Sequence, residues 1–301
     1  MTDKLSEFIK EKRPDISPNT IKTYKSILSN LYFKVFGKCA IDDINFNKYE
    51  KEEKEILEFL KDKPASSRKT TLSALYIITK NDAYREQMLA DITTYNGEIA
   101  EQEKTPSQKE NWLNKDELDK VFNAAEASAM PLLKKKKPLI TKKDLLTIQN
   151  YILLCLMSGK YIPPRRSLDY CQFKVGNIDK SKDNYIKKDE LVFNTYKTAK
   201  IYKEQRVKIP DELVSILKSY IKINPNEYLL FDLNGNPLTS VKLSQRFNKI
   251  FGKKISTNML RHQFLTHRYG YTIEQQKEMN KTFQEMGSST RQATTYIKKD
   301  D

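Results

Sequence analysis

A tyrosine near the end of the chain follows residues that could act on a phosphate group. Arg261 precedes a Gly-Ser turn at residues 286–289, and Tyr296 comes nine residues after Gly287 in a chain of 301 residues. A phenol is a poor nucleophile because its usual pKa is about 10. It becomes effective where cations surround the bond under attack and a neighbour accepts its proton. The order of these residues predicts that Tyr296 attacks a phosphodiester, provided that other segments supply cations.

Two adjacent arginines, Arg165 and Arg166, follow a Pro-Pro turn at the end of an apolar stretch. A guanidinium offers a planar fork of donors that suits two phosphate oxygens, and it stays charged throughout a reaction. Asp169, three residues after Arg166, could lie on the same face and hold that side chain. We favour Arg166 as the phosphate-binding residue, with Arg165 as the alternative. The other interpretation is a surface arginine pair at the start of a helix.

The composition favours a polyanionic partner. The formal net charge is +15, from 54 Lys and Arg against 39 Asp and Glu. Such an excess supports binding to nucleic acid through phosphate neutralisation and counterion release. Acidic residues are also plentiful, and a Lys-rich composition inherited from an AT-biased genome is the other explanation.

Membrane attachment and secretion are not expected. No apolar run approaches the roughly 18 residues of a membrane-spanning helix, and the first residues do not resemble a signal peptide. The three cysteines, Cys39, Cys155 and Cys171, are too widely spaced for a disulfide framework or a zinc site. We expect buried thiols in a reducing compartment, such as the host cytoplasm, the host nucleus or a virion. With two histidines, metal catalysis has little support, and we expect no cofactor and no small-molecule substrate.

Residues 1–103 predict a small helical domain. Ser17 and Pro18 form a helix start, as cap and first-turn residue, and apolar residues at helical spacing follow them. The next segment, 104–109, carries proline and charge without an apolar residue, which predicts a linker. Three further helices of the domain are predicted over residues 49–61, after the Pro-Ala break at 64–65, and over residues 84–102.

Residues 110–301 predict a second domain, mainly helical with a small antiparallel sheet. Asn114 and Glu117 form a loose capping box at its first helix. The apolar stretch 142–158 predicts a buried helix. Alternating residues predict strands at 190–196 and 205–210. Helices are expected over residues 211–223, 240–251, 257–269 and 273–286.

This second domain resembles the catalytic domain of the tyrosine recombinase (phage integrase) family. Each local block is weak alone, but the blocks occur in the family's order and spacing. Residues 1–103 are similar in pattern to the family's helical core-binding domain, which clamps the opposite face of the DNA. The closest likeness is to the divergent branch found in integrating DNA viruses, virophages and large self-synthesising transposons. The blocks are residues 163–170, residues 196–198, residues 260–264, and residues 286–288 together with Tyr296.

The resemblance implies duplex DNA as partner, a homotetramer on paired sites, and a 3′-phosphotyrosyl intermediate on the C-terminal tyrosine. It makes Arg166 and Arg261 the residues that bind the phosphate. It makes Lys197 the general acid that protonates the leaving 5′-oxygen, a role suited to an amine on a mobile hairpin. Lys200 and Lys203 are alternatives on the same hairpin.

The chain departs from the family in two places. Three residues before the second arginine the family has His or sometimes Lys, whereas this chain has Asn258; after the glycine of the later block it has His or Trp, whereas this chain has Ser288. Both replacements can donate a hydrogen bond to a phosphate oxygen, but neither can act as a base as histidine does. His262 cannot point in the direction of Arg261 on a helix, and it is expected to pack or to form a buried hydrogen bond.

The leading hypothesis is a site-specific DNA recombinase or integrase without metal or nucleotide cofactor. A type IB-like topoisomerase shares the chemistry and is the alternative enzyme, although the separate N-terminal domain favours a recombinase. A DNA-binding relic that has lost catalysis through Asn258 and Ser288 is the alternative of a different class.

Overall fold

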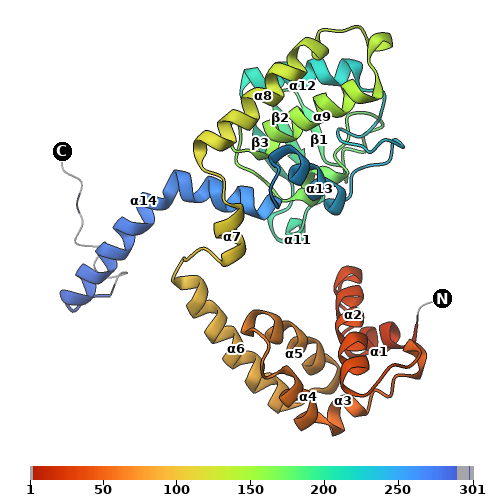
Figure 1. Ribbon diagram of the computed structural model, residues 1–301, viewed down its shortest axis with the longest axis vertical. Coiled ribbons are helices and arrows are strands. Elements are labelled where there is room, and N and C mark those ends of the chain that lie inside the picture. Colours follow the sequence, from red (N-terminus) through yellow and green to blue (C-terminus); the bar gives the residue numbers. More distant parts are fainter. Residues whose placement is uncertain (1–2, 290–297, 299–301) are drawn as a thin grey trace. The chain divides into compact units, whose positions relative to one another are not determined.

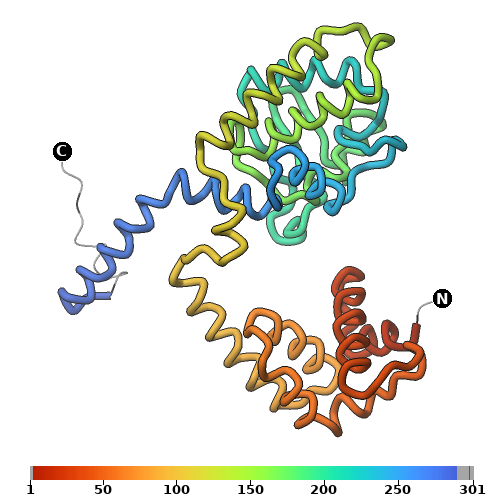
Figure 2. Tube along the Cα trace, viewed as in Figure 1, coloured from red at the N-terminus to blue at the C-terminus, as the bar shows by residue number. Residues whose placement is uncertain are grey.

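The chain folds into two compact units that divide between Lys104 and Thr105 in the computed structural model, which describes residues 3–289 and residue 298. Each unit has its own hydrophobic core. Figures 1 and 2 trace the path of the chain through both units. The described part is mainly helical with one three-stranded antiparallel sheet. The predicted fold class, mainly α with a small sheet, is therefore confirmed.

Helices packed around buried aromatic and aliphatic side chains form the first unit. The rings of Tyr49 and Tyr84 are fully buried, and their hydroxyls donate to the carbonyls of Leu28 (3.0 Å) and Tyr49 (2.6 Å). Each ring therefore adds apolar contact without leaving its hydroxyl unpaired. The elements are α1 (Lys4–Lys12), α2 (Pro18–Val35), the 3-10 helix η1 (Ile41–Asp43), α3 (Lys48–Lys51), α4 (Glu53–Leu60), α5 (Ala65–Thr79) and α6 (Asp82–Ala100).

The local signals for these helices hold in most places. Ser17 caps α2 by accepting from the Thr20 amide, and Pro18 occupies its first turn, as predicted. The single helix predicted over 49–61 is instead two, because the backbone of Glu52 leaves the helical region (φ −100°, ψ 36°) between α3 and α4.

In the second unit, α9 (Lys142–Met157) is the central buried helix. Every residue from Tyr151 to Met157 is fully buried, as the apolar stretch predicts. Cys155 in this helix and Cys171 are buried, whereas Cys39 is exposed, so the expectation of buried thiols is wrong for one of the three cysteines. Burial raises the pKa of the Cys155 thiol to about 12, which keeps it protonated and unreactive.

Strand β2 is the middle strand of a sheet ordered β1-β2-β3. The strands predicted at 190–196 and 205–210 are present as β2 and β3, but both are shorter than predicted. Strand β1 was not predicted. The pairing of β2 with β3 ends at Phe193 opposite Gln205, so residues 194–204 form the connection beyond the last pair. The strands are β1 (Tyr185–Lys187), β2 (Glu190–Phe193) and β3 (Gln205–Lys208).

The helices around this sheet follow local capping signals. The predicted capping box at Asn114 and Glu117 is present at the start of α8. The segment predicted as a linker, 104–109, contains the start of a short helix, because Thr105 and Gln108 form a second capping box there. The helices are α7 (Pro106–Asn111), α8 (Lys115–Leu133), η2 (Lys137–Leu139), α9 (Lys142–Met157), α10 (Ser167–Cys171), α11 (Ala199–Tyr202), α12 (Asp211–Ile223), α13 (Ser240–Phe251) and α14 (Thr257–Glu285).

Helix α14 is the largest departure from the sequence prediction. The two helices predicted over 257–269 and 273–286 form one helix of 29 residues, with Gly270 inside it. Figure 1 shows α14 as a long helix that begins beside the body of the second unit and leaves it.

The described residues contain neither a membrane-spanning helix nor a group of metal-binding side chains. No helix among them is both long and apolar enough to cross a membrane. No group of three His, Cys, Asp or Glu side chains among them could hold a metal ion.

Candidate functional site

The two adjacent arginines stand at the start of α10. The prolines at 163 and 164 precede them, and Arg166 is the N-cap residue, with an extended backbone (φ −70°, ψ 150°). The helix therefore begins one residue later, at Ser167. Both arginines are partly exposed, whereas Asp169 in the first turn is buried.

Asp169 pairs with Arg165, not with Arg166 as the sequence analysis expected. Nε of Arg165 donates to Oδ2 of Asp169 at 2.9 Å. Nη1 of Arg165 donates to Oε1 of Gln205 on β3, also at 2.9 Å. The guanidinium lies over the ring of Phe193, with 4.0 Å from its carbon to the ring centroid. Arg165 is therefore held in place by α10 on one side and by the sheet on the other.

Three guanidinium groups act on the Asp169 carboxyl. Burial raises the pKa of Asp169, and the positive charges of Arg165, Arg166 and Arg261 act in the opposite direction. The second oxygen of this carboxylate, Oδ1, has no hydrogen-bond partner among the described residues. Arg166 and Arg261, about 95 residues apart in sequence and near one carboxyl, thus give the site a net positive charge that suits an anion.

Lys197 lies in the connection between β2 and β3 and is exposed, as are Lys200 and Lys203. The hydroxyl of Tyr196, next to Lys197, donates to the Lys203 carbonyl at 2.6 Å and closes this connection on itself. All three lysines remain candidates for the proton donor by their exposure.

A buried asparagine joins this connection to α10. Asn184, 4 % exposed, donates from Nδ2 to the carbonyls of Asp169 (2.9 Å) and Thr195 (2.8 Å). Its Oδ1 accepts from the amides of Asn194 (2.9 Å) and Thr195 (2.8 Å). All four hydrogen-bonding positions of the side-chain amide are used. The backbone two residues before Lys197 is therefore fixed to the turn of α10 that carries Asp169.

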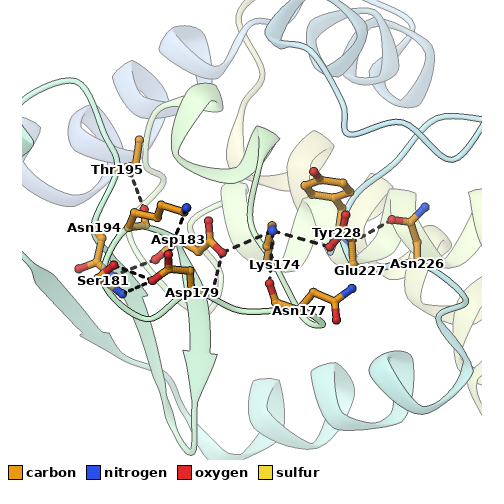
Figure 3. Close-up of polar contacts among 11 residues, drawn as sticks. Lys174, Asn177, Asp179, Ser181, Asp183, Asn194, Thr195, Asn226, Glu227 and Tyr228 are labelled. Carbon is orange, nitrogen blue, oxygen red and sulfur yellow. Dashed lines mark hydrogen bonds and ion pairs between the residues drawn. The ribbon is translucent and has the colours of Figure 1, made fainter.

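Figure 3 shows how the loop at 177–183 supports the same backbone. Thr195 donates from its hydroxyl to the Lys182 carbonyl at 2.6 Å, and Asn194 donates to the Asp183 carbonyl at 2.9 Å. Lys174 in turn lies between Asp183 (3.5 Å) and Glu227 (3.6 Å). Sequence reasoning missed this support, although the run of Asn, Asp and Ser at 177–184 is a typical turn signal.

The first turns of α14 carry Asn258 and Arg261 at the expected spacing. Ser256 caps the helix by accepting from the Met259 amide at 3.2 Å. Asn258 is exposed and Arg261 partly exposed, one turn apart, so the two lie on one face. His262 is exposed, so the expected packing or buried hydrogen bond is wrong.

Helix α14 packs closely against the turn after α9, which leads to the two adjacent arginines. Gly159 has φ +87°, and a side-chain carbon there would overlap the ring of Phe264. Glycine therefore permits both the left-handed turn after α9 and the contact with α14. Phe264 lies three residues after Arg261, so this contact helps to place Arg261 near Arg166.

Ser288 lies far from these arginines. Helix α14 continues to Glu285 and ends in a Schellman motif, in which Ser288 donates to the Phe283 carbonyl (2.8 Å) and Gly287, with φ +70°, donates to Gln284 (3.0 Å). At a rise of about 1.5 Å per residue, the end of the helix is about 36 Å from Arg261. The structure thus brings Arg166, Arg261 and the Lys197 connection together but not Ser288, and Tyr296 lies outside the described residues.

The N-terminal segment matches a known protein family. Residues 2–57 match the family profile of the phage integrase N-terminal SAM-like domain. No curated protein sequence matches the chain.

Among solved structures, the chain is similar to a lambda integrase dimer bound to a COC′ core site, with 17 % identity over 87 % of this chain and 69 % of that chain (TM-score 0.46). It is also similar to a lambda integrase tetramer bound to a Holliday junction, with 17 % identity over 88 % of this chain and 69 % of that chain (TM-score 0.47).

Proposed function

We propose that this chain, whose N-terminal domain is of the phage integrase type and which resembles the tyrosine recombinase family, is a site-specific DNA recombinase or integrase. In this proposal residues 1–103 clamp the DNA and residues 110–301 carry out cleavage and rejoining. The net charge of +15 supports a polyanionic partner. Four copies on two paired sites would be the working assembly, in a member of the viral or mobile-element branch of the family.

The observation that carries the proposal is that the charges of Arg166 and Arg261 both act on the buried Asp169 carboxyl, and that Asn184 joins the backbone of Asp169 to the connection that bears Lys197. Two guanidinium groups can hold the nonbridging oxygens of a phosphate and stabilise the extra charge that develops during attack.

The proposed cleavage forms one bond to phosphorus, breaks another and transfers two protons. The oxygen of Tyr296 attacks phosphorus and releases its phenolic proton to solvent through a neighbouring acceptor. The bond from phosphorus to the 5′-oxygen breaks, and Lys197 gives that oxygen a proton. The products are a 3′-phosphotyrosyl bond and a free 5′-hydroxyl. Attack by a 5′-hydroxyl of another strand reverses the steps and completes the exchange.

The long helix α14 sets a condition on this chemistry. Because the end of α14 is about 36 Å from Arg261 along the helix axis, cleavage within one copy of the chain requires Tyr296 to be brought back across this distance, and a second copy of the chain is the other possible source of the tyrosine. The same observation favours a second candidate function, a DNA-binding protein of this family that does not cleave.

A nicked suicide substrate separates the two candidates. The short strand beyond the cleavage point dissociates after cleavage, which traps the covalent product. A denaturation-resistant adduct supports the recombinase, and its absence together with tight binding supports the DNA-binding protein. Relaxation of a supercoiled plasmid without exchange between paired sites would instead support a topoisomerase.

DNA affinity is expected to fall steeply with salt. Each phosphate neutralised by Lys or Arg releases counterions, so log K falls linearly with log salt concentration, and six to ten contacts lose roughly 10³- to 10⁵-fold between about 50 and 200 mM. Fluorescence anisotropy with a labelled duplex measures the slope. An affinity that is flat over this range would contradict an extended phosphate-binding surface.

The substitution Asn258→His is expected to raise the rate of cleavage. Asn258 is exposed on the first turn of α14, so an imidazole fits there without displacing core residues. A histidine can hydrogen-bond the phosphate and also transfer protons, an effect worth roughly a hundredfold or more where the geometry is right. Single-turnover cleavage of the suicide substrate measures the change.

The matched control for this change is Asn258→Gln, which extends the side chain without adding a group that titrates near neutral pH. A rate increase that both variants share would mean that size, not proton transfer, is responsible. Ser288→His tests the second departure in the same assay. If wild type shows no cleavage and neither histidine variant rescues it, the enzyme proposal is wrong.

A further inference from the structure

Arg165 contacts the base of the hairpin that carries Lys197. Phe193 and Gln205 are the last paired residues of β2 and β3 before the connection at 194–204. Arg165 contacts both of them, through the ring face of Phe193 (4.0 Å to the centroid) and the amide oxygen of Gln205 (2.9 Å). Its guanidinium carbon is also 5.2 Å from the ring centroid of Tyr196, the residue before Lys197.

The other edge of the same guanidinium is fixed to α10. Nε donates to Asp169, and the Arg165 side chain is 18 % exposed against 3 % for Asp169. A planar group held by a carboxylate on one edge, an amide on another and an aromatic ring on its face has little freedom to turn toward a substrate. Arg165 therefore acts as a rigid connection between the helix start at Arg166 and the hairpin.

We infer that Arg165 is a positioning residue, which holds the Lys197 hairpin at a fixed place beside the phosphate that Arg166 binds. This inference rests on the proposed function. It assigns separate roles to two adjacent arginines, since Arg166 contacts the substrate and Arg165 acts through Lys197. Asn184 binds the backbone of the same hairpin. Arg165 contacts side chains of the hairpin, and each of these can be replaced singly.

A substrate with sulfur in place of the leaving 5′-oxygen distinguishes these roles. A thiolate is a much weaker base than an alkoxide, with a thiol pKa of about 8.5, so it departs without a proton from Lys197. The phosphate is otherwise unchanged, and its nonbridging oxygens still need Arg166 and Arg261. Loss of proton donation is therefore rescued by this substrate, and loss of phosphate binding is not.

The experiment compares single-turnover cleavage of the two substrates by the full-length chain. Arg165→Ala and Gln205→Ala are expected to slow cleavage of the ordinary substrate by on the order of tenfold or more, because they misplace the proton donor. On the sulfur substrate both variants, and Lys197→Ala, are expected to come within about threefold of wild type, because no proton donation is needed. Arg166→Ala should stay slow on both substrates.

Gln205→Ala is the control for loss of folding in Arg165→Ala. It removes the contact between Arg165 and the hairpin but leaves the buried Asp169 paired with Arg165. Thermal unfolding of each variant checks this point. The inference is overturned if Arg165→Ala stays as slow as Arg166→Ala on the sulfur substrate, since Arg165 would then bind the phosphate. It is also overturned if both hairpin variants cleave the ordinary substrate at the wild-type rate. Wild type that cleaves neither substrate would instead overturn the proposed function, and the inference with it.

Discussion

Replacing Tyr296 with phenylalanine is expected to abolish covalent attachment to DNA and to leave DNA affinity nearly unchanged. The change keeps the ring and removes only the oxygen that, in the proposed mechanism, attacks phosphorus. Loss of an essential nucleophile slows an enzyme by on the order of a millionfold. A labelled suicide substrate on a denaturing gel measures the adduct, and fluorescence anisotropy measures binding.

Tyr269→Phe and Tyr271→Phe are the matched controls for this variant. Both tyrosines lie on α14 and are exposed, at 44 % and 73 %. Both controls should form adduct at the wild-type rate. If the Tyr296→Phe protein still forms an adduct that survives denaturation, another tyrosine is the nucleophile.

Arg166→Ala and Arg261→Ala are each expected to slow cleavage by on the order of a hundredfold or more. Each change removes a charged donor from the phosphate, and the loss of one donor that stabilises a transition state costs about this much. Single-turnover kinetics at saturating protein separates this effect from weaker binding. Arg165→Ala is expected to lose less, because that side chain is bound to Asp169 and Gln205 rather than to the phosphate.

Arg268→Ala is the control for Arg261→Ala on the same helix. Arg268 is exposed, and its guanidinium carbon is 5.8 Å from the ring centroid of Phe264, so it is a surface cation of α14 outside the arginine cluster. Its loss should change salt-dependent affinity slightly and the cleavage rate little. Equal slowing by Arg268→Ala and Arg261→Ala would mean that general positive charge, not a specific phosphate contact, determines the rate.

Elements whose signals lie within a few residues could be predicted with their bounds. Helix α13 begins where Thr239 accepts from the Lys242 amide and ends at Gly252, whose φ of 64° suits glycine. Helix α12 follows Pro210 and has an apolar stripe at helical spacing. Helix α14 was predicted to break near Gly270, but a glycine inside a helix costs only about 1 kcal/mol, which the adjoining turns can offset.

The sequence also predicted which residues do chemistry, because Arg166, Lys197 and Arg261 occur in the order of the family that the chain resembles, and these roles stay predictions. The residues that contact these side chains could not be predicted from the sequence. The helix-face rule predicted that Asp169 holds Arg166, but Arg166 has an extended backbone as the N-cap. The i, i+3 spacing of a helix therefore does not apply to Arg166, and Asp169 pairs with Arg165 instead.

Only the tertiary structure decided which segments support the Lys197 hairpin. Arg165 and Gln205 are 40 residues apart, and Asn184 reaches Asp169 across 15 residues. No local pattern marks either contact, because a guanidinium or an amide takes whichever acceptor the fold brings within hydrogen-bonding distance. The helix start and the strand ends each form by local rules, but burial of Asp169 and Asn184 in one core brings them together and thereby sets the place of Lys197 relative to Arg166.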